Sequence, residues 1–149
     1  MTSETQNKEL STLLQKYDEF VNLKLKPDLK ATLDARNEIF DILSEYQKLK
    51  SQIDLIQKHD LKELKTMVDL GSQFYAQAVV PDTQYIYVNV GFGFHVQFTL
   101  DEAKVFIEKK EKRLQSTVDK YSADADKIRA HIKMVLEAMA EIMETQKGA

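Results

Sequence analysis

The apolar positions of this chain form three blocks with two different periods. From about Glu9 to His59, apolar residues recur mostly every three or four positions, as on one face of a helix. Residues 66–99 instead alternate with period two, are rich in β-branched and aromatic side chains, and contain no Lys or Arg. After this block the helical spacing returns and continues to about residue 146. The pattern predicts two long amphipathic helices joined by a small sheet.

The first helix, expected over about residues 9–65, has one irregularity. From Ala35 onward its apolar steps alternate between four and three, which is typical of a coiled-coil seam. Before Pro27 the steps of four follow one another and break this repeat. Proline removes a backbone hydrogen bond and crowds the preceding turn. We expect either one helix kinked near residues 24–28 or a short helix followed by a long one.

The second helix has a clear start and needs a partner. Thr99 and Glu102 have the spacing of a capping box, and no Gly or Pro interrupts the chain before Gly148. We expect one helix over about residues 100–146. A single narrow apolar stripe does not stabilise helices this long, so the two helices pair antiparallel. The predicted fold class is α+β, a long antiparallel coiled coil capped by two β-hairpins, in one domain over 1–149.

The block over residues 66–99 predicts two hairpins. Gly91 and Gly93 separate two alternating runs, Gly71 separates two more, and Pro81–Thr83 links the pairs. We expect no internal repeat. A sheet this small cannot cover its own edges and faces, which favours strand pairing with other chains over packing under its own helices. The candidate subunit assembly residues are Tyr85, Tyr87, Val88, Val90, Gly91, Gly93, Phe94 and Val96.

Composition and charge exclude several classes of function. Charged residues make up 30% of the 149 positions and the formal net charge is −3, so no basic face for nucleic acid or an anionic membrane is expected. The absence of Cys excludes disulfides and thiolate chemistry. No stretch has the length of a membrane span, and the N-terminus does not resemble a signal peptide. We expect the protein in the cytosol or the nucleus.

No group of residues predicts an active site or a cofactor site. His59, His95 and His131 lie on different predicted elements without convergent acids, so neither a metal site nor a catalytic base is expected. The Gly91–Gly93 pair lacks the third glycine of a dinucleotide fingerprint. The basic run over residues 109–113 is interrupted by an acid, as on a solvated helix face. We expect no enzymatic activity, no catalytic residue, no metal and no cofactor.

The helix ends farthest from the predicted sheet form a candidate binding tip. Antiparallel pairing brings Tyr17 near Met143, where apolar residues outside the seam accumulate. Methionine is flexible and suits surfaces that accept many shapes. A splayed tip could grip apolar segments of another protein, but a wider stripe that closes the helix pair more tightly explains the same pattern. The candidate tip residues are Leu10, Leu13, Leu14, Tyr17, Phe20, Val135, Met139, Ile142 and Met143.

Two segments have a recognisable pattern. The second hairpin reads VNVGFGFHV (Val88–Val96), and LDEAKVFI (Leu100–Ile107) opens the second helix. Both are similar to the α-type subunits of prefoldin, a jellyfish-shaped hexameric chaperone. Further segments resemble one subgroup, the ubiquitously expressed transcript proteins: Val68–Gly71, Val79–Thr83 and Lys127–Met134. The resemblance covers about residues 15–143.

The resemblance implies an assembly and its partners. In prefoldin, α-type and β-type chains close their hairpins into β-barrels, and the coiled coils hold non-native proteins for a chaperonin. The subgroup belongs to a variant complex associated with heat-shock co-chaperones and transcription components, in nucleus and cytoplasm. The resemblance thus implies a co-chaperone subunit with β-type and other α-type prefoldin subunits as partners, and client binding at the tip residues. The alternative is a coiled-coil adaptor or transcription cofactor that docks folded partners.

Overall fold

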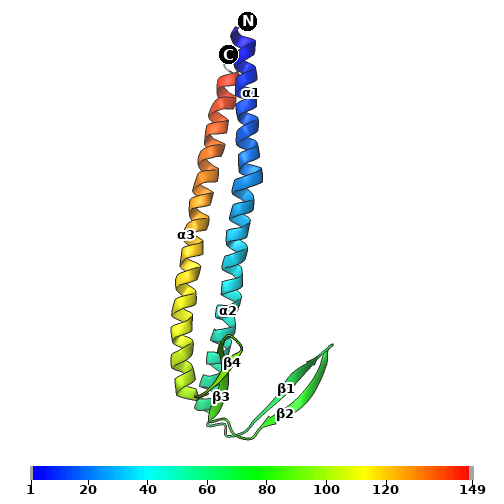
Figure 1. Cartoon of the computed structure of the whole chain (residues 1–149), viewed down its shortest axis with the longest axis vertical. Coiled ribbons are helices and arrows are strands. Elements are labelled where there is room, and N and C mark those ends of the chain that lie inside the picture. Colours follow the sequence, from blue (N-terminus) through cyan, green and yellow to red (C-terminus); the bar gives the residue numbers. More distant parts are fainter. Residues whose placement is uncertain (1, 148–149) are drawn as a thin grey trace. The chain divides into compact units, whose positions relative to one another are not determined.

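The computed structural model describes residues 2–147 and has the predicted α+β architecture (Figure 1). Two helical regions run antiparallel, and two antiparallel β-hairpins lie between them in the sequence. In chain order the elements are α1 (Thr2–Phe20), the π-helical turn η1 (Val21–Leu25), α2 (Lys26–Lys58), β1 (Leu64–Gly71), β2 (Phe74–Val80), β3 (Tyr85–Gly91), β4 (Phe94–Thr99) and α3 (Leu100–Lys147).

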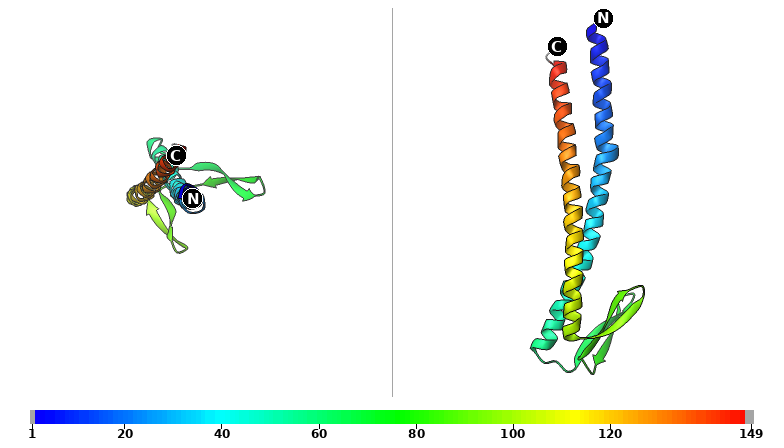
Figure 2. Two further views of the ribbon diagram at one scale, coloured as in Figure 1. Left: turned by 90° about the horizontal axis from the view of Figure 1, so that it is seen from above. Right: turned by 60° about the vertical axis from the view of Figure 1, so that its left-hand side comes forward.

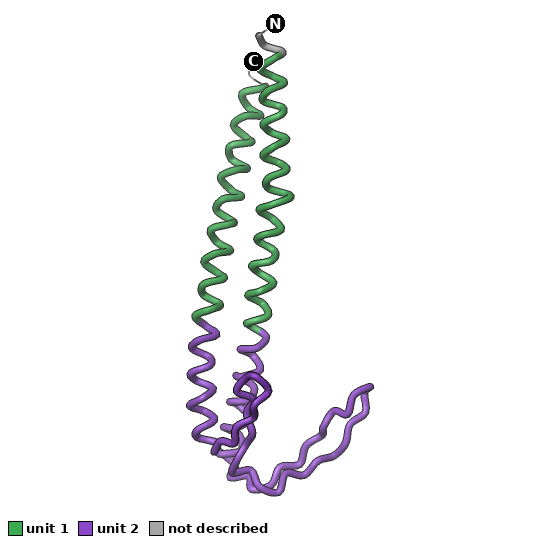
Figure 3. The backbone as a smooth tube through the Cα atoms, in the orientation of Figure 1, with its two compact units in different colours: residues 1–40, 116–149 green, residues 41–115 purple. Residues whose placement is uncertain are grey.

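The chain divides into two compact units, each containing a pair of helical segments (Figure 3). Unit 1 comprises residues 1–40 and 116–149, and unit 2 comprises residues 41–115 with both hairpins. The helices α2 and α3 each contribute to both units. The assignment of the whole chain to one domain stays a prediction.

The first helical region continues through the sequence irregularity without a break. Val21–Leu25 form a single π-helical turn, in which the backbone N–H of Lys26 donates to the carbonyl of Val21. A π turn inserts one extra residue into the helix and absorbs the change in phase of the apolar stripe. Pro27 lies in the first turn of α2 directly after it. The irregularity expected near residues 24–28 is thus a π turn over Val21–Leu25 that connects two α-helices, a shorter one and a longer one.

The helix limits differ modestly from those expected. The first helical region begins at Thr2, before the expected start near residue 9, and ends at Lys58, before the expected end near residue 65. The sequence predicts disorder in the first few residues and in Lys147–Ala149, whereas α1 begins at Thr2 and α3 ends at Lys147. Gly148 and Ala149 lie outside the described residues. The start of α3 is confirmed. The Thr99 hydroxyl accepts from the Glu102 N–H at 3.2 Å, and the Glu102 carboxylate accepts from the Thr99 N–H at 3.0 Å.

The core of unit 2 joins both helices to the second hairpin. Ile53 of α2 and Ala103 and Ile107 of α3 are 0–1% exposed and form one cluster. The partly buried side chains packed against them come from α2, from β3 and β4, and from the start of α3: Tyr46, Leu49, Ile86, Phe98 and Leu100. The β3–β4 hairpin is therefore held against the helices by apolar contacts.

Polar contacts between the helices of unit 2 surround this core. The Lys104 ammonium lies 2.6 Å from the Asp54 carboxylate, and this hydrogen bond raises the pKa of Lys104. The same ammonium donates to Gln57, which in turn donates to Asp101. Lys50 pairs with Glu108 at 3.3 Å. Because they join α2 to α3, these contacts favour one register of the two helices.

Unit 1 has a narrower apolar seam. Val21 and Leu25 of the π turn are buried, as are residues of α3 at helical spacing, Val118, Ala125 and Met139. The ring of Phe20 meets the imidazole of His131 edge to face, with the centroids 5.7 Å apart. Ion pairs such as Lys24–Asp28 and Lys133–Glu137 run along single helices. Apolar and aromatic side chains from both helices thus pack together in this unit.

The two hairpins are built alike, contrary to the expectation of no internal repeat. In the first hairpin Thr66 pairs with Ala78 and Val68 with Ala76. The second hairpin has the same register 20 residues later, where Ile86 pairs with Phe98 and Val88 with Val96. Each hairpin has a register shift just before its turn. In each, a side-chain oxygen accepts from a glycine N–H two residues later, Asp69 from Gly71 at 2.7 Å and Asn89 from Gly91 at 2.9 Å. Both turns share the sequence pattern V-[DN]-[LV]-G-x-x-F, at residues 68–74 and 88–94. The repeat is hard to recognise because the other strand residues differ between the two hairpins.

We predict that Ile107→Ala destabilises the chain by about 2–5 kcal/mol, because it leaves a cavity at a fully buried position of unit 2. The matched control is Val105→Ala on the same helix, which removes a side chain that is 52% exposed and changes stability by less than about 0.5 kcal/mol. Urea unfolding followed by circular dichroism measures both. Equal losses for the two variants would contradict the placement of the core.

Candidate functional site

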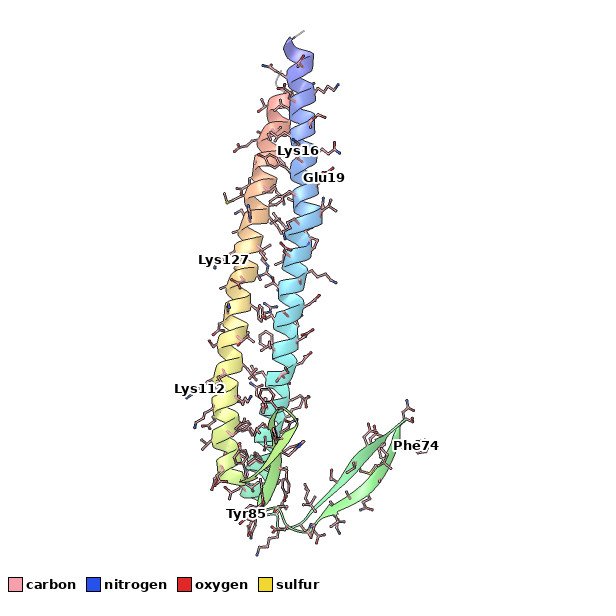
Figure 4. The ribbon with its side chains drawn as sticks, in the orientation of Figure 1. Lys16, Glu19, Phe74, Tyr85, Lys112 and Lys127 are labelled. Carbon is pink, nitrogen blue, oxygen red and sulfur yellow. The ribbon has the colours of Figure 1, made fainter. Side chains whose placement is uncertain are left out.

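The β1–β2 hairpin exposes large apolar side chains along its length. Met67 is 66% exposed, Leu70 68% and Phe74 72%. In β1 only Leu64 is partly covered, and in β2 only Ala76 and Ala78. Figure 4 shows Phe74 at the end of this hairpin, and Figures 1 and 2 show the hairpin extending away from the helices of unit 2. Its surface is that of an element that lacks a packing partner.

The β3–β4 hairpin has one covered and one open face. Ile86, Val88 and Val90 lie on the covered face, as their alternation predicts, and Val88 is only 5% exposed. Tyr85 and Tyr87 lie on the open face. Val88, although predicted to mediate subunit assembly, is thus covered within its own chain. The predicted assembly residues that remain exposed are Tyr85, Tyr87, Gly91, Gly93, Phe94 and Val96, and their role stays a prediction.

The turn of this hairpin has an unusual backbone. Gly91 has φ +111° and Gly93 has φ +79°, in the region that glycine adopts without strain. Between them, Phe92 has φ +53° and its side chain is fully exposed. Sequence reasoning identified both glycines as turn residues and overlooked Phe92. The sequence did contain a signal for Phe92, because such turns prefer Asn or Gly at this position and a large apolar residue is unusual there.

A groove lies between α2 and β3 in unit 2. It has a volume of about 550 Å³, and its apolar lining includes Ile42, Tyr46, Leu49 and Tyr87. Glu45 and Lys48 contribute charged groups to the same lining. Ile42, on α2, is 45% exposed and therefore accessible from this groove. This groove adjoins Tyr87 and Asn89 on the open face of the second hairpin.

The predicted tip residues lie in unit 1 on both helices. Leu10, Leu14, Tyr17, Val135 and Ile142 are half-buried along the seam, and Met139 is buried. Leu13, Phe20 and Met143 remain 36–46% exposed. Three neighbours outside the predicted set are more exposed still: Leu23 at 75%, Met134 at 67% and Leu136 at 49%. The structure therefore divides the predicted tip into seam residues and available residues.

A shallow groove joins the two helices at this tip. Leu10 and Leu13 line it from α1 and Thr145 from α3, with a volume of about 450 Å³. The predicted proximity of the beginning of the first helix to the end of the second is thus present within unit 1. Binding of another protein at the tip stays a prediction.

The described residues show no cluster of three or more His, Cys, Asp or Glu side chains that could hold a metal ion. Over the same part of the chain, no helix has the length and apolar character needed to span a membrane. His131 contacts Phe20, and His95 lies on an exposed strand position opposite Asn89.

Sequence comparisons with known proteins identify the family of this chain. The family profile described as "Prefoldin subunit" matches residues 25–145. The chain belongs to the prefoldin family. It is 49% identical over 131 residues to the "Protein UXT homolog" of Nematostella vectensis, covering 87% of this chain and 82% of that protein. To the human "Protein UXT" it is 37% identical over 131 residues, covering 88% of this chain and 83% of that protein.

A more distant relative supports the same family. The "Prefoldin subunit alpha" of Pyrococcus horikoshii is 24% identical over 142 residues, covering 94% of this chain and 91% of that protein. The higher identity to proteins named UXT confirms the subgroup inferred from the sequence segments. The chain is therefore a prefoldin-like subunit of the UXT subgroup.

We predict that Gly91→Ala destabilises the chain by about 1–2 kcal/mol, although open space surrounds the position. The cost comes from the backbone, since a residue with a Cβ is strained at φ +111°. Gln97→Ala, at an exposed position of β4, is the control and is expected to have a small effect. Chemical denaturation measures both, and a neutral Gly91→Ala would contradict the turn geometry.

Proposed function

We propose that this chain is a non-enzymatic co-chaperone subunit of a prefoldin or prefoldin-like hetero-oligomer, present in cytoplasm and nucleus. Its hairpins join β-type and other α-type prefoldin subunits. Its tip binds non-native or unassembled proteins, which the complex delivers to a chaperonin or to heat-shock co-chaperones, and transcription components are among the partners. Family membership and the exposed apolar surfaces support this proposal.

The β1–β2 hairpin carries the assembly part of the proposal. A two-stranded hairpin is at best marginally stable in water by itself, and its outer edges present unpaired backbone groups. Here the hairpin also exposes Met67, Leu70 and Phe74. At about 25 cal/mol per Å² of buried apolar surface, covering three such side chains provides several kcal/mol for association. Strands from neighbouring subunits would cover both the edges and these side chains.

The exposed residues of the tip support the client-binding part. Leu13, Phe20, Met134 and Met143 are partly or largely exposed, and two of them are methionines. Flexible thioether side chains adapt to apolar segments of different shape. Binding through several subunits at once raises the overall affinity without requiring a deep pocket on any one of them. No nucleotide is needed for binding of this kind.

We predict that mild isolation of the chain from its own cells recovers other prefoldin-family subunits in stoichiometric amounts. Native mass spectrometry of the isolated assembly measures its composition. Identification of the subunits distinguishes prefoldin proper from a variant complex. Recovery of folded regulatory proteins without any prefoldin-family subunit would contradict the proposal and favour the adaptor alternative.

We predict that the combined change Leu13→Ser, Phe20→Ser and Met143→Ser reduces suppression of client aggregation at least fivefold, because it removes exposed apolar area from the tip. The matched control is Leu55→Ser with Val105→Ser, which changes side chains of similar exposure, 54% and 52%, in unit 2. Light scattering of denatured actin diluted into the assembled complex measures both. Unchanged suppression by the tip variant would exclude client binding at these residues.

A further inference from the structure

Phe92 combines full exposure with an unfavourable backbone conformation. Its relative accessibility is 103% and its φ is +53°, in the left-handed region. Bulky residues are rare there because the Cβ crowds the backbone, and two-residue hairpin turns of this kind prefer Asn, Asp or Gly. Asp60, Ser72 and Gln73 also have positive φ, so Phe92 is distinguished by the combination of this backbone with a bulky, fully exposed apolar ring.

The first hairpin provides an internal comparison. It has the same register 20 residues earlier and the same bond from an Asp or Asn side chain to a glycine N–H. Ser72 occupies the position that corresponds to Phe92, with a φ of +50°. The turn therefore forms with a small polar residue at this position, and folding does not require an aromatic ring. The contribution of the ring must come from a contact beyond its own hairpin.

The surroundings of Phe92 indicate the chemistry of that contact. Residues 84–100 contain no Lys, Arg, Asp or Glu, and Phe94 on the same hairpin is 69% exposed. An uncharged aromatic projection fits an apolar recess, where burial of the ring is most favourable. This chain has such a recess between α2 and β3, lined by Ile42, Leu49 and Tyr87. A neighbouring subunit with the same two-hairpin architecture would have a corresponding groove.

We propose that Phe92 is an interface anchor whose ring inserts into the groove between the first helical region and the second hairpin of a neighbouring prefoldin-family subunit. The proposal rests on the hetero-oligomer proposed above and specifies one of its contacts. Aromatic side chains in apolar pockets commonly contribute a large share of binding energy at protein interfaces. Such a contact also explains why the turn has a residue that its backbone conformation disfavours.

Phe92→Asn separates the effect of this residue on the stability of the turn from its proposed effect on subunit binding. Asn followed by Gly93 is a favoured pair for this turn, so the urea midpoint of the isolated chain is expected to stay unchanged or to rise. The affinity for the prefoldin-family subunits that co-purify with the chain is expected to fall at least tenfold. Leu55→Asn makes an apolar-to-asparagine change at a 54% exposed position of α2, outside both hairpins, and is expected to leave that affinity unchanged. Surface plasmon resonance with the reconstituted partner subunits measures both.

The location of the ring is tested in the assembled complex. Phe92 is replaced by the photoreactive p-benzoylphenylalanine, and cross-linked peptides are identified by mass spectrometry. A cross-link to the groove-forming helix or strand of a neighbouring prefoldin-family subunit is expected. Cross-links confined to a second copy of this chain or to a protein of another family would overturn the proposal, as would the absence of any cross-link or an unchanged affinity of Phe92→Asn. Failure of the native chain to assemble would also refute the proposed hetero-oligomer, whereas normal assembly with an unaffected variant refutes only the anchor.

Discussion

The structure depends on the fact that a two-stranded hairpin cannot satisfy its own edges. Each sheet here contains two strands, so every strand has one edge without a partner among the described elements. The β3–β4 hairpin offsets this partly by packing Ile86 and Phe98 against the Ile53 cluster of the helices. The β1–β2 hairpin has no comparable cover, and the side chains along it are mostly exposed. The same hairpin thus exists once with helical support and once without it, and the unsupported one is the physical basis of the proposed association with other chains.

The helices meet a different requirement, which is to fix one register over a long seam. In unit 2 this is achieved by buried Ile53 and Ile107 together with the ion pairs of Lys50 and Lys104 across the helices. Exposed ion pairs contribute little stability, about 0–1 kcal/mol each, but opposite charges across a seam penalise other registers. In unit 1 the seam is apolar, with Val21 and Val118 buried. Both units therefore have an apolar seam, and in unit 2 ion pairs between the helices accompany it.

Much of this architecture could be predicted from the sequence because the signals were local. The capping box of Thr99 and Glu102, the alternation of Ile86, Val88 and Val90, and the glycine turns each depend on neighbouring residues, and each is present in the structure. The end of the first helix was less predictable. The apolar spacing persists to Ile56, but Asp60 has φ +45°, and the sequence after Lys58 has neither Gly nor Pro to mark the change.

The candidate sites were less predictable because exposure depends on tertiary packing. Val88 and Tyr87 are adjacent residues of one strand, yet only Val88 is covered, since its face meets the helices. Met139 and Met143 are one helical turn apart, and only Met143 remains exposed. Sequence patterns assigned these residues to common sets. Only the packed structure separates those that stabilise the chain from those available to a partner.

The two exposed apolar surfaces differ in a way that matches two kinds of recognition. The hairpins present β-branched and aromatic side chains, such as Val96, Tyr87 and Phe94, on strands whose register is fixed by backbone pairing. Such side chains lose little conformational entropy on binding and suit a contact with defined geometry. The tip presents Met134, Met143 and Leu13 on exposed helix surfaces. These flexible side chains tolerate varied shapes at some entropic cost. A rigid surface favours a fixed subunit neighbour, and a flexible one favours clients that differ from one another.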